Sequence, residues 1–183
     1  MRWTYLDLIT DLVKGERCVA IRNVSWAEEV LHDHFDRDPE AGREAMPVMP
    51  NTLVIEGAAQ CGGILTGHAH DFREKVILAK IGKATFTGLP AGPGTTLRHT
   101  ASLDRIDASR SATVQTVELL DPLTGEAQPY AEVELMFSHI DQNRKGLAFP
   151  KHNFVFTDDF MDLLDRSGYP VDPSIDPRKR SAR

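Results

Sequence analysis

Apolar and polar residues alternate along the second half of the chain, which indicates β-strands. The clearest case is the segment 129–140, where Ala131, Val133, Leu135 and Phe137 share one face. Other segments rich in β-branched residues complete a set of about five predicted strands: 17–24, 75–88, 95–107, 110–121 and 129–140. Residues 122–128 are typical of a hairpin connection.

A different pattern runs from residue 51 to about residue 70, where small and apolar residues follow one another for longer than a strand usually lasts. This favours a helix that follows Pro50, with Asn51 or Thr52 as its N-cap. Each glycine in a helix costs roughly 1 kcal/mol relative to alanine, which predicts close packing against a sheet or a second helix. The glycines are Gly57, Gly62, Gly63 and Gly67.

The remaining segments are less regular. Residues 26–50 are predicted to be irregular, with a charged loop at 36–45, and residues 156–168 to form a short helix that Thr157 or Asp158 caps and Gly168 ends. One long apolar helix and several antiparallel strands predict an α+β fold in which a curled sheet wraps around the helix. We expect residues 1–140 to form this domain, and residues 141–183 to form an extension whose last part is flexible.

Composition and charge narrow the class of protein. A formal net charge of −6 and a pI of about 5.6 argue against nucleic-acid binding, and no apolar run is long enough to span a bilayer. Asp7 and Asp11 interrupt the first apolar segment, so it does not resemble a secretory signal. Cys18 and Cys61 lie among apolar neighbours, which suits buried, reduced thiols. The sequence therefore predicts a cytoplasmic protein without a disulfide.

One charged residue, Glu56, occurs between residues 46 and 67. On a helix it shares a stripe with Thr52, Gln60, Gly63 and Gly67. Because an exposed stripe would normally carry lysine or arginine, this one is expected to meet another protein surface or a cavity. Burial raises the pKa of a carboxyl group and suits it to act as a general acid.

Two histidines precede the helix, His32 and His34, and histidine is the usual general base near neutral pH. A base and an acid together can eliminate water: the base removes the proton next to a carbonyl, and the acid protonates the departing hydroxyl. The carbonyl oxygen then needs hydrogen-bond donors. The free N–H groups at the start of the helix, residues 51–53, are the expected donors.

These motifs resemble the 3-hydroxyacyl-[acyl-carrier-protein] dehydratases of fatty-acid synthesis, which have the hot-dog fold. The family's pattern is a strand ending in Asn-Val, nine residues, His-Phe, a Pro-Val-Met-Pro segment, an acid on the helix and a glutamine four residues later. Here "AIRNV" ends at Val24, nine residues lead to His34 and Phe35, and "PVMPNTLVIEGAAQ" follows. The resemblance covers about residues 3–140.

The resemblance implies that His34 is the base and Glu56 the acid, contributed by opposite protomers of a homodimer that can assemble into a trimer of dimers. It also implies that an acyl carrier protein delivers the substrate and that no metal or cofactor is needed. Phe35, Pro50, Asn51, Thr52 and Gln60 would bind the substrate, with the thioester carbonyl at the backbone N–H of Asn51. This sequence departs from the pattern in the long segment 36–46 and in Asn51, which replaces a glycine.

Three alternatives remain open. A hot-dog thioesterase would use the same acyl-thioester pocket, with the carboxylate directing a water molecule. A subunit that binds acyl chains without catalysis would keep the pocket and lose the chemistry. A zinc hydrolase would use the pairs His32/His34 and His68/His70, which have the spacing of metal ligands on strands.

Overall fold

The computed structural model describes residues 4–33, 36–42, 44–140, 153–173 and 176. These residues form a six-stranded sheet and three helices. The strands are β1 (Leu8–Val13), β2 (Arg17–Asn23), β3 (Lys75–Phe86), β4 (Thr96–Ile106), β5 (Arg110–Leu120) and β6 (Ala127–Ile140). The helices are α1 (Val30–Asp33), α2 (Asn51–Ala69) and α3 (Asp158–Arg166).

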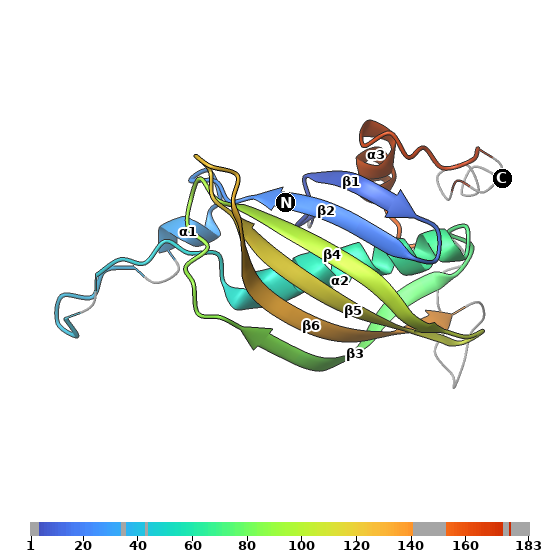
Figure 1. Cartoon of the computed structure of the whole chain (residues 1–183), viewed down its shortest axis with the longest axis horizontal. Helices are drawn as coiled ribbons and strands as arrows, with labels where there is room; N and C mark the ends of the chain where they lie inside the picture. The colour runs from blue at the N-terminus through green and yellow to red at the C-terminus, as the bar shows by residue number, and fades with distance from the viewer. Residues whose placement is uncertain (1–3, 34–35, 43, 141–152, 174–175, 177–183) are drawn as a thin grey trace.

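The sheet is antiparallel throughout, in the order β1-β2-β4-β5-β6-β3. The long helix α2 lies along one face of the sheet and contacts every strand from β2 to β6 (Figure 1). This confirms the predicted α+β architecture of an antiparallel sheet wrapped around one long helix. The predicted helix 51–70 and the four predicted strands after it are present, with ends that differ by only a few residues.

Strand β6 alternates as predicted. Ala131, Val133, Leu135 and Phe137 are buried beneath α2, and the residues between them are more exposed. The inward faces of β4 and β5 are less apolar than those of β6, because they bury polar side chains under the helix. These are His99, Ser111, Thr113 and Gln115.

The glycines of α2 allow this close packing, as predicted, at three of their four positions. A Cβ atom on Gly57 would lie 3.0 Å from the ring of His99, and one on Gly62 would lie 2.6 Å from the amide of Gln115. A Cβ atom on Gly67 would lie 2.2 Å from the ring of Phe156. At Gly63 the nearest atom would be 3.9 Å away, so this position has room for a side chain.

The prediction of about five strands was wrong, because it left out β1. Ile9 and Leu12 are both buried although they are three residues apart, a spacing typical of a helix. A β-bulge between Ile9 and Asp11 shifts the pairing with β2 and changes the alternation. The two acids of the first apolar segment have partners on β2: Asp11 pairs with Arg17, and Asp7 pairs with Arg22.

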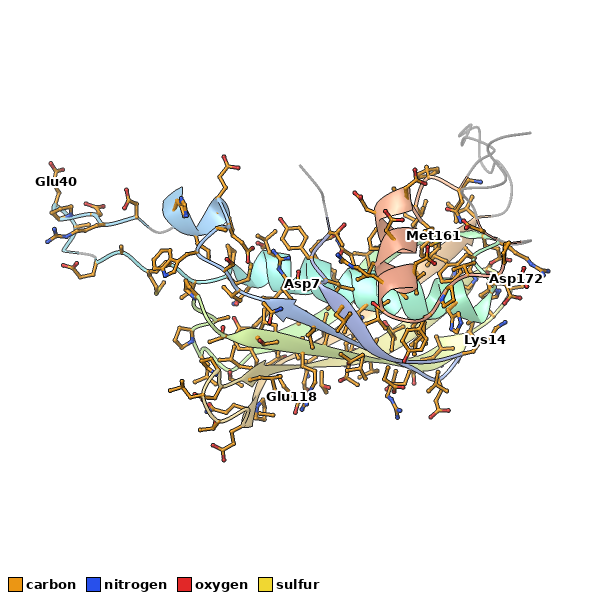
Figure 2. All side chains as sticks on the ribbon, turned by 90° about the horizontal axis from the view of Figure 1, so that it is seen from above. Asp7, Lys14, Glu40, Glu118, Met161 and Asp172 are labelled. Carbon is orange, nitrogen blue, oxygen red and sulfur yellow. The ribbon has the colours of Figure 1, made fainter. Side chains whose placement is uncertain are left out.

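The irregular region before α2 contains a helical turn, α1, which was not expected. Leu31 of α1 is buried in a cluster with Val54 of α2, and this contact attaches the segment to the body of the protein. The charged loop that carries Glu40 extends away from the body (Figure 2). The expected loop character of residues 36–45 is thus confirmed for the residues that the structure describes.

Helix α3 lies on the same side of the sheet as α2, and Met161, Leu163 and Leu164 are buried there (Figure 2). The helix ends as predicted, with Gly168 at a φ of 85°. Thr157 is its N-cap by position, but the Thr157 side chain forms no capping hydrogen bond. The end predicted to be flexible is residues 169–183. Within it, Tyr169 and Val171 pack against the core and Asp176 is buried, whereas residues 174–175 and 177–183 lie outside the described residues. The division of the chain at residue 140 stays a prediction.

Two further predictions concern the cysteines and the membrane. Cys18 and Cys61 are both buried and free, as expected, and the Cys61 thiol lies 3.5 Å from the carbonyl oxygen of Cys18. Among the helices that the structure describes, none is both long and apolar enough to cross a bilayer.

Candidate functional site

The N-terminus of α2 is open to a ligand. Pro50 is its N-cap residue, and no side chain caps it, so the prediction that Asn51 or Thr52 would do so was wrong. The N–H groups of Leu53 and Val54 donate to the carbonyl oxygen of Pro50, at 2.9 and 3.2 Å. The N–H groups of Asn51 and Thr52 precede these bonds, and the first N–H groups of a helix have no acceptor within the helix.

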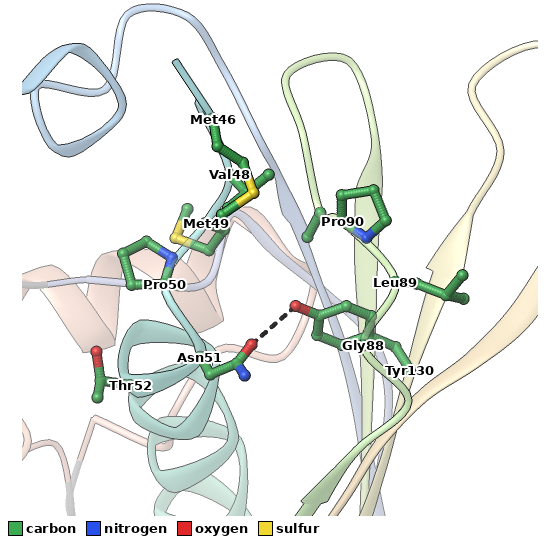
Figure 3. A pocket seen from close by; sticks show the side chains of 11 residues that line it. Met46, Val48, Met49, Pro50, Asn51, Thr52, Gly88, Leu89, Pro90 and Tyr130 are labelled. Carbon is green, nitrogen blue, oxygen red and sulfur yellow. Dashed lines mark hydrogen bonds between the residues drawn. The ribbon is translucent and has the colours of Figure 1, made fainter. Parts of the chain in front are cut away.

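A cavity of about 370 Å³ adjoins this end of α2 (Figure 3). One wall is the segment from Met46 to Thr52, and the other comprises residues 88–91 and Tyr130. Tyr130 donates a hydrogen bond to Oδ1 of Asn51 at 3.1 Å. Asn51 is the first residue of the helix, and the N-cap position belongs to Pro50, which has no side-chain acceptor. Tyr130 was not predicted to belong to this site.

Glu56 lies one turn further along α2 and is half-buried. Nε2 of Gln60 donates to Oε1 of Glu56 at 2.9 Å, and Oε1 of Gln60 accepts from the backbone N–H of Tyr5 at 2.7 Å. Because Tyr5 engages the amide oxygen, the amide nitrogen must face the carboxylate. Gln60 therefore fixes one oxygen of Glu56 and leaves the other available to a ligand.

Glu56 also faces an apolar groove of about 220 Å³. Ala59, Gly63 and Ile64 of α2 form one wall, and side chains of β3, β6, α3 and the segment before α3 form the others. The other groove-lining residues are Val76, Leu78, Phe137, Val155, Phe156 and Phe160. The predicted polar stripe of α2 does meet a cavity.

The pocket and the groove lie along one helix. Glu56 lies five positions after Asn51, or about 7.5 Å along the axis. A ligand whose polar group contacts the start of α2 can thus bring a second polar group to Glu56 and extend an apolar chain into the groove. The structure therefore brings together five of the predicted site residues around this track: Pro50, Asn51, Thr52, Glu56 and Gln60.

Two predicted residues, His34 and Phe35, lie outside the described residues. Pro50 is buried behind the N-terminus of α2 and lines the same pocket as Asn51. His32 is exposed on α1, where its ring contacts the backbone carbonyl of Trp26. The roles predicted for these residues stay predictions.

The proposed zinc site made of two histidine pairs is wrong for the histidines that the structure describes. His32 lies beside the N-terminus of α2, whereas His68 and His70 lie at its C-terminus (Figure 1). A helix of this length measures about 28 Å, so one ion cannot bridge its two ends. His68 and His70 are also not on a strand, the geometry on which the pairing depended.

Comparisons with known proteins agree with this geometry. The family model described as a FabA-like domain matches residues 3–120. A 3-hydroxyacyl-[acyl-carrier-protein] dehydratase FabZ of Clostridium kluyveri is 32% identical over 139 residues, which span 75% of this chain and 86% of that protein. The FabZ of Ligilactobacillus salivarius is also 32% identical, over 55% of this chain and 66% of that protein.

Solved structures share the fold at low sequence identity. An acyl-CoA hydrolase of Staphylococcus aureus has a TM-score of 0.54 at 16% identity and covers 97% of this chain and 92% of its own. A thioesterase family protein of Silicibacter pomeroyi also has a TM-score of 0.54, at 15% identity, covering 72% of this chain and 82% of its own. The dehydratase heterocomplex ApeI:P of Xenorhabdus doucetiae has a TM-score of 0.52 at 14% identity, with coverage of 74% and 82%. These similarities establish the hot-dog fold and nothing finer.

Proposed function

This chain is a divergent member of the FabA-like family of 3-hydroxyacyl-[acyl-carrier-protein] dehydratases, and from that premise we propose that it removes water from 3-hydroxyacyl thioesters. The observation that carries the proposal is the position of Glu56. Its carboxylate is oriented by Gln60 and faces an apolar groove, one turn from the first N–H groups of α2, which have no acceptor within the helix.

In the proposed reaction the thioester carbonyl accepts hydrogen bonds from the N–H groups of Asn51 and Thr52, which stabilise negative charge on the oxygen. His34 takes a proton from the α-carbon, and the electron pair of that C–H bond forms the double bond. The C–O bond at the β-carbon breaks, and Glu56 donates its proton to the departing hydroxyl, so the products are a trans-2-enoyl thioester and water.

The proposal assigns each cavity a part of the substrate. The groove between α2 and β3, with its phenylalanine side chains, suits an acyl chain. The cavity beside Asn51 and Tyr130 lies on the carbonyl side, where the phosphopantetheine arm of an acyl carrier protein would enter. The names of the relatives include the acyl carrier protein, which supports a carrier-bound substrate. The two buried free thiols, Cys18 and Cys61, support a location in the reducing cytosol.

The family pattern also supports a homodimer in which the base comes from the partner. Leu31 anchors the described end of α1 against the core, so the segment that carries His34 starts from a fixed point. In the part of the chain that the structure describes, the edge strand β3 pairs only with β6 and exposes Leu78 and Ile81. Such an edge is suited to pairing with a second copy.

The first test is the activity of the Glu56→Gln variant. This change keeps the size of the side chain and removes the proton donor, so the rate of enoyl-thioester formation should fall at least about a hundredfold without loss of folding. The measurement follows the enoyl product by mass after incubation with a series of 3-hydroxyacyl thioesters on acyl carrier protein and on coenzyme A.

A matched control is Glu118→Gln, the same change on the opposite side of the sheet (Figure 2), which should leave the rate unchanged. A Glu56→Gln variant that keeps the wild-type rate would disprove the assignment of the acid. Release of free thiol in place of an enoyl product would show a thioesterase, and neither product would favour a binding subunit.

A further inference from the structure

A second cluster of polar side chains lies at the other end of α2. It comprises His70, which follows the last residue of the helix, Glu74, which precedes β3, and His139, the residue before the end of β6. One ligand atom of each residue lies within 4.8 Å of those of the other two. Glu74 and His139 meet because β3 and β6 pair here, with Val76 opposite His139.

The cluster contains buried polar atoms without hydrogen-bond partners. Within the residues that the structure describes, Nε2 of His70, Oε2 of Glu74 and Nδ1 of His139 are shielded from solvent and form no hydrogen bond. Burying such a group without a partner typically costs about 1–3 kcal/mol, and more if it is charged. Oε2 of Glu74 lies near Nδ1 of both histidines, and an ion bound by these three side chains would offset this cost.

The surroundings of the His139 ring also favour a cation site. Its Nε2 lies 3.2 Å from Oγ of Ser111, which in turn lies 3.1 Å from Oγ1 of Thr66. Nδ1 of His139 lies 3.2 Å from Oε2 of Glu74. In the tautomer with the proton on Nε2, the lone pair of Nδ1 faces the carboxylate, and a cation between these two acceptors would bind both. In the other tautomer, Nδ1–H donates to Glu74 instead. A hydrogen bond to the second ring nitrogen is also the usual support of a histidine metal ligand.

Two distances in the cluster are close to those around a small tetrahedral ion. Ligand atoms about 2.0–2.1 Å from zinc are about 3.3 Å from one another. Here Oε2 of Glu74 lies 3.2 Å from Nδ1 of His139 and 3.7 Å from Nδ1 of His70. His139 is inaccessible, whereas a quarter of the surface of His70 and of Glu74 is exposed. The exposed side leaves room for a water molecule as the fourth ligand.

We propose that His70, Glu74 and His139 form a site for a zinc ion that joins the end of α2 to the paired strands β3 and β6. Two imidazoles and one carboxylate are a typical ligand set for zinc. Glu56 lies fourteen residues from His70, or about 21 Å along the helix. The ion would therefore stabilise the fold rather than contact the substrate.

The test measures zinc binding by full-length protein that carries no polyhistidine tag. After treatment with a chelator, the protein is titrated with Zn²⁺ against a chromophoric chelator, and bound metal is counted by mass spectrometry. The wild type should bind one zinc ion per chain and unfold at a higher temperature with zinc than without. His70→Ala and Glu74→Gln should each weaken binding at least about a hundredfold, because each removes a ligand.

The control is His68→Ala, which removes a histidine two residues before His70. The ring of His68 lies beside Phe72, with the two ring centroids 6.0 Å apart. It should bind zinc as the wild type does. Substitution with Co²⁺ uses only the wild type, so its result does not depend on whether a variant folds. We expect the visible absorption bands of a tetrahedral ion with nitrogen and oxygen ligands. A wild type without stoichiometric zinc and without such bands, or equal binding by all variants, would overturn the proposal. Neither readout depends on dehydratase activity.

Discussion

His99 is an ionisable residue in a fully buried position. Its ring lies under α2, 3.0 Å from the place of a Cβ atom on Gly57, and Nδ1 has no hydrogen-bond partner in the described chain. Burial lowers the pKa of His99 from 6.5 to about 4, because the charged ring would lose its hydration. The folded protein therefore holds His99 in its neutral form at neutral pH.

This shift predicts that acid destabilises the protein. The unfolded chain binds a proton at His99 below about pH 6.5 and the folded chain only below about pH 4. The free energy of unfolding should thus fall by about 3 kcal/mol between these values and show no contribution from His99 at higher pH. The measurement is urea unfolding at a series of pH values. His99→Leu should flatten this part of the profile, while His32→Ala, a change at an exposed histidine, should keep it. An unchanged slope in His99→Leu would refute the assignment.

At the scale of elements, α2 uses its glycines for two purposes. Gly57, Gly62 and Gly67 allow contact with β4, with β5 and with Phe156, respectively, and an added Cβ would collide at each. Gly63 lines the groove, and the nearest atom to an added Cβ is Cε1 of Phe137 at 3.9 Å. The space beside Gly63 is therefore part of the groove rather than a packing contact.

Two substitutions at Gly63 should separate groove length from folding. Gly63→Leu places a large side chain in the groove and should lower kcat/KM for long-chain 3-hydroxyacyl thioesters at least about tenfold, with little effect on 3-hydroxybutyryl thioesters. Gly63→Ala adds only the Cβ atom and should preserve both activities. Equal losses for short and long substrates in Gly63→Leu would mean that the groove does not hold the acyl chain.

At the scale of the whole molecule, the two edges of the sheet differ. The edge strand β1 is short and contacts α3. The edge strand β3 has twelve residues, and the side chains of Leu78 and Ile81 are 37% and 45% exposed. A long edge with apolar side chains favours association with another chain. The proposed catalytic site needs such a second copy, because the family pattern takes His34 from the partner.

Complementation tests this arrangement. His34→Ala and Glu56→Gln should each be inactive alone, but a mixed dimer has one site with both residues intact if the two come from different protomers. Random mixing of equal amounts after unfolding and refolding should restore about a quarter of the wild-type activity, because half of the dimers are mixed and half of their sites are complete. No recovery, in dimers that mass measurement shows to be mixed, would place both residues in one protomer or exclude one of them.

The sequence by itself determined the elements whose patterns are local. The alternation of β6, the length of α2 and the turn at Gly168 each follow from neighbouring residues, and an ordered set of motifs identified the family and Glu56. Tertiary structure decided what depends on contacts between distant segments. The bulge in β1 gave this strand the spacing of a helix, and Tyr130 of β6 meets Asn51 at the start of α2. The meeting of His70, Glu74 and His139 exists only because β3 and β6 pair. Periodicity records which face of an element is buried, but it carries no information about which distant residue lies opposite that face.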